Sequence, residues 1–66
     1  MTTDRTCTVT DLTNDRVEGS HFPNASAAMR YAKGFRNTDV IFCVTRNADG
    51  SHVAYVSRGE EIDYTV

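Results

Sequence analysis

The chain has few cysteines, no long apolar run and no excess of basic side chains. Two cysteines in 66 residues are too few for the disulfide framework that holds many small secreted domains together. No apolar segment reaches the roughly 18 residues that a membrane-spanning helix needs. The first residues, Met-Thr-Thr-Asp-Arg-Thr, contain no apolar signal region. These absences predict a cytoplasmic protein.

Nine acidic and seven basic side chains give the chain a formal net charge of -2. A dedicated nucleic-acid binder usually has a clear basic excess, so the charge argues mildly against that class and leaves a local basic patch open. We expect residues 1–66 to form a single small domain, which buries about 60% of the surface of its unfolded chain. Because a deep substrate cavity would use up so small a core, function is expected on a surface.

The sequence also lacks a catalytic motif. Cys7, Cys43, His21 and His52 are potential zinc ligands, but they are scattered one per predicted element, whereas zinc sites usually contain close ligand pairs. A nucleophilic pair of Cys43 with His52 would have no third residue to orient it and no pocket. We therefore predict a protein that is not an enzyme and that uses no metal or cofactor.

The most informative segment is Asn47-Ala48-Asp49-Gly50, which separates apolar runs at residues 40–44 and 53–56. Asparagine suits the first position of a type I turn, and a glycine after the turn can adopt the left-handed conformation of a bulge. The segment therefore predicts a β-hairpin with a three-residue loop, 48–50. The expected cross-strand pairs are Asn47 with Ser51, Val44 with Ala54, and Phe42 with Val56.

A helix is predicted over residues 25–33. Asn24 is a good N-cap, and Gly34 follows as a C-terminal cap. The residues between them are mostly strong helix formers. Small and aromatic residues have the spacing of a buried stripe along this helix, at Ala28, Tyr31, Ala32 and Phe35.

The predicted fold class is α+β, with an antiparallel sheet of about four strands and one helix packed on one face, in the order β-α-β-β-β. Strands are expected at 5–10, 39–46, 52–57 and 62–66, and residues 17–22 can add a short edge strand before the helix. Pairing Val56 with Ile62 and Ala54 with Tyr64 keeps apolar side chains together. The helix-covered face would hold Cys7, Val9, Val40, Phe42, Val44, Ala54, Val56, Ile62 and Tyr64. The other face would hold Ile41, Cys43, Thr45, Val53, Tyr55, Ser57, Glu61, Asp63 and Thr65.

An acidic cluster is predicted beside an aromatic residue on the uncovered face. Glu60, Glu61 and Asp63 lie near Tyr55 in the expected register. Such a cluster is either a solvated edge or a patch that docks on a basic partner, because tyrosine offers a large contact area and carboxylates suit Arg and Lys. If the cluster docks on a basic partner, Ile41 and Val53 would add apolar contacts beside it.

A basic group is predicted around the C-terminal end of the helix, formed by Arg30, Lys33, Arg36 and Arg46. Arg30 and Lys33 interact favourably with the negative end of the helix dipole, which explains their positions without any bound ligand. A patch that contacts nucleic-acid phosphates is the alternative.

The size, the order of elements and the acidic-leaning surface resemble those of small phage-borne anti-CRISPR proteins that inhibit type I systems. One such family has a similar β-α-β-β-β plan and an Ala-Tyr pair with Gly four positions after the Tyr, matched here by Ala54, Tyr55 and Gly59. The helix is loosely similar, with Ser26-Ala27 near its start and Ala32-Lys33 and Phe35 towards its end. That family leans basic, whereas this chain is net acidic.

The resemblance implies stoichiometric binding to a subunit of a CRISPR effector complex in the host cytoplasm, without catalysis. An acidic member would occupy the basic groove meant for target DNA and mimic its charge. Tyr55, Glu61 and Asp63 would make the contacts. Two alternatives stay open: a nucleic-acid-binding module that uses the basic group, and a structural homodimer that hides the face of Ile41, Cys43 and Tyr55.

Overall fold

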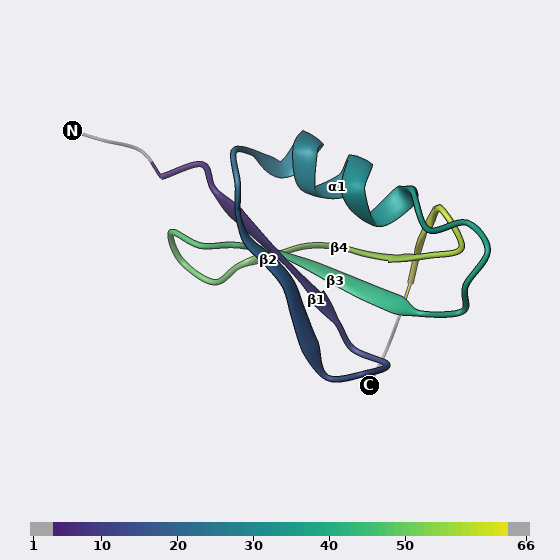
Figure 1. The fold of residues 1–66 in the computed structure, drawn as a ribbon. Coiled ribbons are helices and arrows are strands. Elements are labelled where there is room, and N and C mark those ends of the chain that lie inside the picture. The colour runs from purple at the N-terminus through teal and green to yellow at the C-terminus, as the bar shows by residue number, and fades with distance from the viewer. Residues whose placement is uncertain (1–3, 64–66) are drawn as a thin grey trace.

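A computed structural model describes residues 4–63, which form five antiparallel strands and one helix that lies across one face of the sheet (Figure 1). The elements are β1 (Cys7–Asp11), β2 (Arg16–Phe22), α1 (Ala25–Lys33), β3 (Ile41–Arg46), β4 (His52–Ser57) and β5 (Glu60–Ile62). Their order in the sheet is β2-β1-β3-β4-β5. The α+β class and the single layer of helix on sheet are therefore confirmed for this part of the chain.

The segment before the helix, which the sequence pattern left open, is a full strand. β2 pairs with β1 and lies at one edge of the described sheet. Its register shifts twice, and such bulges twist an edge strand and make it a poorer template for other chains. At Gly19 a side chain would meet the ring of Phe22, since a Cβ there would lie 2.8 Å from Cε2. The glycine therefore lets Phe22 fold back over its own strand.

The helix α1 has the predicted bounds because its capping signals are local. Asn24 Oδ1 accepts a hydrogen bond from the N–H of Ala27 at 2.9 Å, which satisfies a donor of the first turn. At the other end, the N–H of Gly34 donates to the carbonyl of Tyr31 at 3.1 Å. Gly34 has φ of -70°, so it ends the helix in a right-handed conformation.

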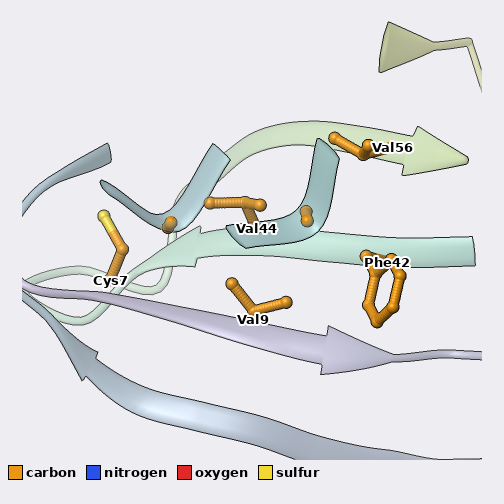
Figure 2. Packing of buried hydrophobic residues seen from close by; sticks show 7 residues of the cluster. Cys7, Val9, Phe42, Val44 and Val56 are labelled. Carbon is orange, nitrogen blue, oxygen red and sulfur yellow. The ribbon is translucent and has the colours of Figure 1, made fainter. Parts of the chain in front are cut away.

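The core is a thin layer between α1 and the sheet (Figure 2). Ala28 and Ala32 are fully buried, and their small side chains let the helix lie close to the strands. The labelled side chains of Figure 2 rise from β1, β3 and β4 toward the helix. Five predicted core positions are confirmed, namely Cys7, Val9, Phe42, Val44 and Val56, and Val40 packs against their cluster.

A row of aromatic rings extends this core along the helix. Phe22, Tyr31, Phe35 and Phe42 follow one another with ring centroids 5.1 Å apart at each step, within the range of favourable ring pairs. The Tyr31 hydroxyl donates to Glu18 Oε1 at 3.0 Å. Burial, and to a smaller extent this carboxylate, raises the pKa of Tyr31. The rings of Tyr31 and Phe35 are therefore used in packing.

The β3–β4 hairpin keeps the predicted register in its middle and departs from it near the loop. Gly50 has the expected left-handed conformation, with φ of 72°. The N–H of Arg46 donates to the carbonyl of Ser51 at 2.8 Å, so the predicted pairing of Asn47 with Ser51 is wrong and the loop is 47–50. The confirmed pairs are Val44 with Ala54 and Phe42 with Val56.

Asn47 leaves the hairpin because it bonds to two neighbouring segments. Its backbone N–H donates to the carbonyl of Thr6 at 3.0 Å. Its side-chain Nδ2 donates to Thr6 Oγ1 at 2.8 Å and to the carbonyl of Ser20 at 2.7 Å, and its Oδ1 accepts from the Thr8 hydroxyl at 2.5 Å. These bonds tie the loop to β2 and to the start of β1.

The longer loop is offset by a β-bulge at Val53. Val44 pairs with Ala54, but the next residue, Thr45, pairs with His52, which leaves Val53 as the extra residue of β4. Val53 packs against the core cluster. Its predicted place on the uncovered face is therefore wrong, because the bulge breaks the alternation of side chains along the strand.

The β4–β5 hairpin is one residue out of the predicted register. Arg58 and Gly59 have φ of 55° and 81°, as expected for a two-residue type I′ loop. The observed pairs are Tyr55 with Ile62, Val56 with Glu61 and Ser57 with Glu60. The predicted pairing of Val56 with Ile62 is therefore wrong. The predicted pairing of Ala54 with Tyr64, and the expected positions of Thr65 and Val66, lie outside the described residues.

Candidate functional site

Within residues 4–63, no element covers the face of the sheet opposite α1 (Figure 1). Ile41, Cys43 and Tyr55 lie on this face, as predicted, and each is partly buried. Threonines flank them, since Thr10 pairs with Cys43 and Thr8 pairs with Thr45. The face is therefore a mixture of apolar and hydroxyl-bearing side chains.

The β4–β5 hairpin presents a group that we call the acidic hairpin surface, formed by Tyr55, Glu60, Glu61 and Asp63. Its three carboxylates are exposed. The ion pairs between described side chains join Arg16 to Glu18 and Arg58 to Asp39. Glu60, Glu61 and Asp63 therefore form no ion pair with another residue in the range 4–63.

The plane of the sheet divides the acidic hairpin surface. Side chains of directly paired residues share a face, so Ile62 and Glu60 lie on the side of Tyr55. Glu61 pairs with Val56 and lies on the side of the helix. The predicted grouping of Glu61 with Tyr55 on one face is therefore wrong.

An open depression of about 600 Å³ lies at the edge of the sheet beside β4 and β5, and its lining includes Tyr55, Ile62, Val53 and the two acidic residues Glu61 and Asp63. The ring of His52 lies against that of Tyr55, with a centroid separation of 4.3 Å. This contact restricts the tyrosine ring, and a restricted aromatic side chain loses less entropy when a partner binds. The depression thus combines aromatic rings, aliphatic side chains and two carboxylates.

Three of the four predicted basic residues line a second depression, which we call the basic groove. It has a volume of about 660 Å³ and lies between α1 and β5, with Arg30, Lys33 and Arg36 along it and Ala25, Met29 and Glu61 among its other lining residues. The groove exists because α1 packs over β1, β3 and β4, whereas β5 lies beyond β4 and near the C-terminal end of α1 (Figure 1).

Arg46 does not belong to this group, contrary to prediction. It lines a separate depression near the start of α1, together with Asp4, Arg5 and Asn24. Its guanidinium donates to Ser51 Oγ at 3.3 Å. Arg46 is the last residue of β3 and lies far from the C-terminal end of the helix. The spacing of basic residues in the sequence does not show this separation.

The cysteines lie on opposite faces of the sheet, as predicted. Cys7 is buried in the core, and burial raises the pKa of the Cys43 thiol on the other face. A raised pKa leaves less thiolate at neutral pH, which makes Cys43 a weak nucleophile. In the described residues, His, Cys, Asp and Glu side chains form no group of three that could hold a metal ion.

The sequence held one signal that could have placed Glu61 correctly. Arg58-Gly59 lies between two runs of strand-forming residues, and glycine at the second position suits the positive φ of a two-residue type I′ loop. Such a loop makes Ser57 face Glu60 and so sends Glu61 to the helix side. The sequence prediction used a three-residue loop, because that loop brings Val56 and Ile62 together.

No protein-family model, curated protein or solved structure matches the chain. No helix among residues 4–63 is both long enough and apolar enough to cross a membrane. The function is therefore argued from the two surfaces described above.

Proposed function

We propose that this protein is a stoichiometric, non-catalytic inhibitor that binds a nucleic-acid-handling complex in the cytoplasm, with a CRISPR effector complex as the specific candidate. The acidic hairpin surface would enter a basic groove of the partner that normally receives target DNA. The observation that carries this proposal is the group of exposed carboxylates on the β4–β5 hairpin, which form no ion pair within residues 4–63 and lie beside a tyrosine that packs against His52.

The chemistry of this surface fits a basic protein partner. Carboxylates that have no internal cation remain available for arginine and lysine, and complementary charge speeds association and selects the partner. Tyr55 and Ile62 line one depression and offer an apolar anchor beside these charges. Ile62 lies on the side of Tyr55 and gives the apolar support there, whereas Val53 lines the same depression but also packs against the core cluster.

The resemblance to anti-CRISPR proteins adds the class of partner. Ala54, Tyr55 and Gly59, the residues that carry it, all lie on the β4–β5 hairpin or its turn. The acidic hairpin surface is part of the same element. Its net negative charge favours mimicry of DNA over competition through a basic surface.

The test is a pull-down with tagged protein from the lysate of a bacterium that carries a type I CRISPR system, read by mass spectrometry. We expect stoichiometric recovery of effector subunits, and expect added target DNA to reduce it. Tyr55→Ala and the double variant Glu60→Lys/Asp63→Lys should each abolish recovery while remaining folded. Glu61 is left unchanged because it also lines the basic groove.

The matched control is Asp4→Lys/Asp49→Lys, which changes the net charge equally and places the new lysines outside the acidic hairpin surface. This variant should still recover the effector subunits. Failure of the unmodified protein to recover effector subunits would reject the proposed function. Full recovery by both Tyr55→Ala and Glu60→Lys/Asp63→Lys would reject the acidic hairpin surface as the contact.

A further inference from the structure

Within residues 4–63, the three cations of the basic groove form no ion pair, whereas two other arginines do. Arg16 and Arg58 pair with Glu18 and Asp39 at 3.0 Å and 2.5 Å. Arg30, Lys33 and Arg36 form no ion pair or side-chain hydrogen bond with another residue in the range 4–63. Helix-dipole stabilisation accounts for Arg30 and Lys33 in the last turn of α1, but it does not account for Arg36, which follows the helix and lines the same groove.

The rest of the groove lining is suited to an extended chain. Ala25 and Met29 provide apolar surface on the helix side, and methionine adapts its shape to different partners. β5 lies at the other edge of the described sheet. In a two-residue hairpin the closing pair exchanges backbone hydrogen bonds, so Glu60 and Ile62 bond to β4 and the backbone groups of Glu61 point outward.

Glu61 distinguishes between two kinds of anionic occupant. Its carboxylate lines the same groove as the three cations. A nucleic-acid backbone carries a charge on every phosphate and would be repelled at Glu61, and the lining that residues 4–63 provide contains no aromatic ring on which a base could stack. A peptide can place acidic side chains against the cations and a neutral or basic one opposite Glu61.

We infer that the basic groove is a docking site for an extended acidic segment of a partner protein, which adds as a strand beside β5. Alternate side chains of such a strand point to the helix side, where Arg30 and Lys33 would receive carboxylates and Met29 an apolar side chain. The outward N–H and C=O groups of Glu61 would bond to the backbone of the segment. This inference is independent of the proposed function, because it concerns a different surface.

The experiment measures binding of a fluorescent peptide in which aspartate alternates with leucine, at low salt, with a single-stranded DNA oligonucleotide as the competing probe. We expect the peptide to bind more tightly than the oligonucleotide, and we expect its affinity to fall as the salt concentration rises. Arg30→Glu/Lys33→Glu should reduce peptide affinity by about tenfold or more, since two attractions become repulsions. Glu61→Gln should increase it, because a like charge is removed.

The matched control is Arg5→Glu/Arg46→Glu, which changes the same charge at the opposite end of α1 and should leave peptide affinity unchanged. A peptide methylated on alternate backbone nitrogens should bind less well if it pairs with β5. The inference would be overturned if Arg30→Glu/Lys33→Glu and Arg5→Glu/Arg46→Glu lost the same amount of peptide affinity. It would also be overturned if the methylated peptide bound as tightly as the unmethylated one. Preferred binding of the oligonucleotide would also overturn it and assign the groove to nucleic acid. The Arg30→Glu/Lys33→Glu variant should still recover effector subunits in the pull-down described above. That result would show that the basic groove and the acidic hairpin surface bind different partners.

Discussion

Asp11 shows how one carboxylate can set the end of a strand. The residue is 3% exposed, and its two oxygens accept from the N–H of Asn14 at 2.9 Å and from its Nδ2 at 2.8 Å. The side-chain hydrogen bond from Asn14 is the largest cause that lowers the pKa of Asp11, and burial opposes it. The carboxylate thereby orders the turn from β1 to β2 while it is ionised.

This arrangement predicts a loss of stability in acid. A pKa lower in the folded than in the unfolded state gives stabilisation that is complete above the unfolded pKa and is lost as pH falls through the folded one. We expect the free energy of unfolding to fall as pH drops below the ordinary aspartate value of 3.8. Asp11→Asn should lower stability at neutral pH and flatten this slope, as measured by urea unfolding across the pH range.

Asp15→Asn is the control, since Asp15 is exposed and asparagine tolerates its φ of 53°. This variant should keep the acid slope. Some slope should remain in Asp11→Asn, because hydrogen bonds from Thr6 and Ser51 also lower the pKa values of Asp4 and Asp49. A pH profile of Asp11→Asn identical to that of the unmodified protein would contradict the role given to Asp11.

At the scale of elements, the turn between β4 and β5 is held against the end of α1. Gly59 has φ of 81°, and a Cβ there would lie 2.8 Å from Arg36 Cγ and 3.1 Å from the carbonyl oxygen of Lys33. Gly50 has a similar φ of 72°, but a Cβ there would meet nothing within 4 Å. A substitution at Gly50 therefore tests backbone strain alone, whereas the same substitution at Gly59 adds a steric clash.

We predict that Gly59→Ala destabilises the protein more than Gly50→Ala. The left-handed conformation alone costs a non-glycine residue about 1 to 2 kcal/mol, and this is the whole effect expected at Gly50. At Gly59 the new methyl group must also displace Arg36 or the end of α1, which distorts the basic groove. Chemical denaturation of both variants measures the difference, and equal losses would show that the turn does not press on the helix.

The elements themselves could be predicted because their signals are local. Asn24, Gly34 and the spacing of Ala28 and Ala32 define α1 within a few residues of sequence, and the structure confirms its bounds. The turn residues at 47–50 likewise predicted Val44 opposite Ala54, and this pair forms because the bulge at Val53 offsets a loop one residue longer than predicted. These features depend on contacts between near neighbours in the chain or across one hairpin.

The details that determine the candidate surfaces depend on distant or competing contacts. Asn47 was assigned to a hairpin pair, but its side chain bonds to Thr6 and Ser20, which are 41 and 27 residues away in sequence. Apolar matching favoured Val56 opposite Ile62, and the geometry of the two-residue loop overrides it. That shift of one residue moves Glu61 to the other face, which is why the basic groove could not be found from the sequence pattern.

At the scale of the whole molecule, the described chain has one layer of helix and therefore two unequal faces. Cys7 lies on the covered face and is 1% exposed, so a reagent reaches its thiol only when the packing of β1 opens. Cys43 lies on the other face, partly buried, where burial raises the pKa of its thiol. The two thiols thus report separately on unfolding and on access to the uncovered face.

We predict that iodoacetamide modifies Cys43 in the folded protein, at a rate below that of a free cysteine, and that the rate rises at higher pH than for a free thiol. Cys7 should be modified at the rate of global unfolding, which added denaturant accelerates. Mass spectrometry of the labelled peptides separates the two sites. Cys43→Ser serves as the control, since it should leave one slow modification site.

The rate at which iodoacetamide modifies Cys43, measured at different protein concentrations, distinguishes a monomer from the homodimer that the sequence left open. Thr8, Thr10 and Thr45 keep the uncovered face partly polar, and partly polar faces are compatible with water. We therefore expect the modification rate of Cys43 to be the same from micromolar to millimolar protein. If the rate falls as concentration rises while the rate of Cys7 does not change, a second copy covers Ile41, Cys43 and Tyr55. Tyr55 would then belong to a subunit interface, and the proposed contact with an effector complex would have to use the exposed carboxylates without it.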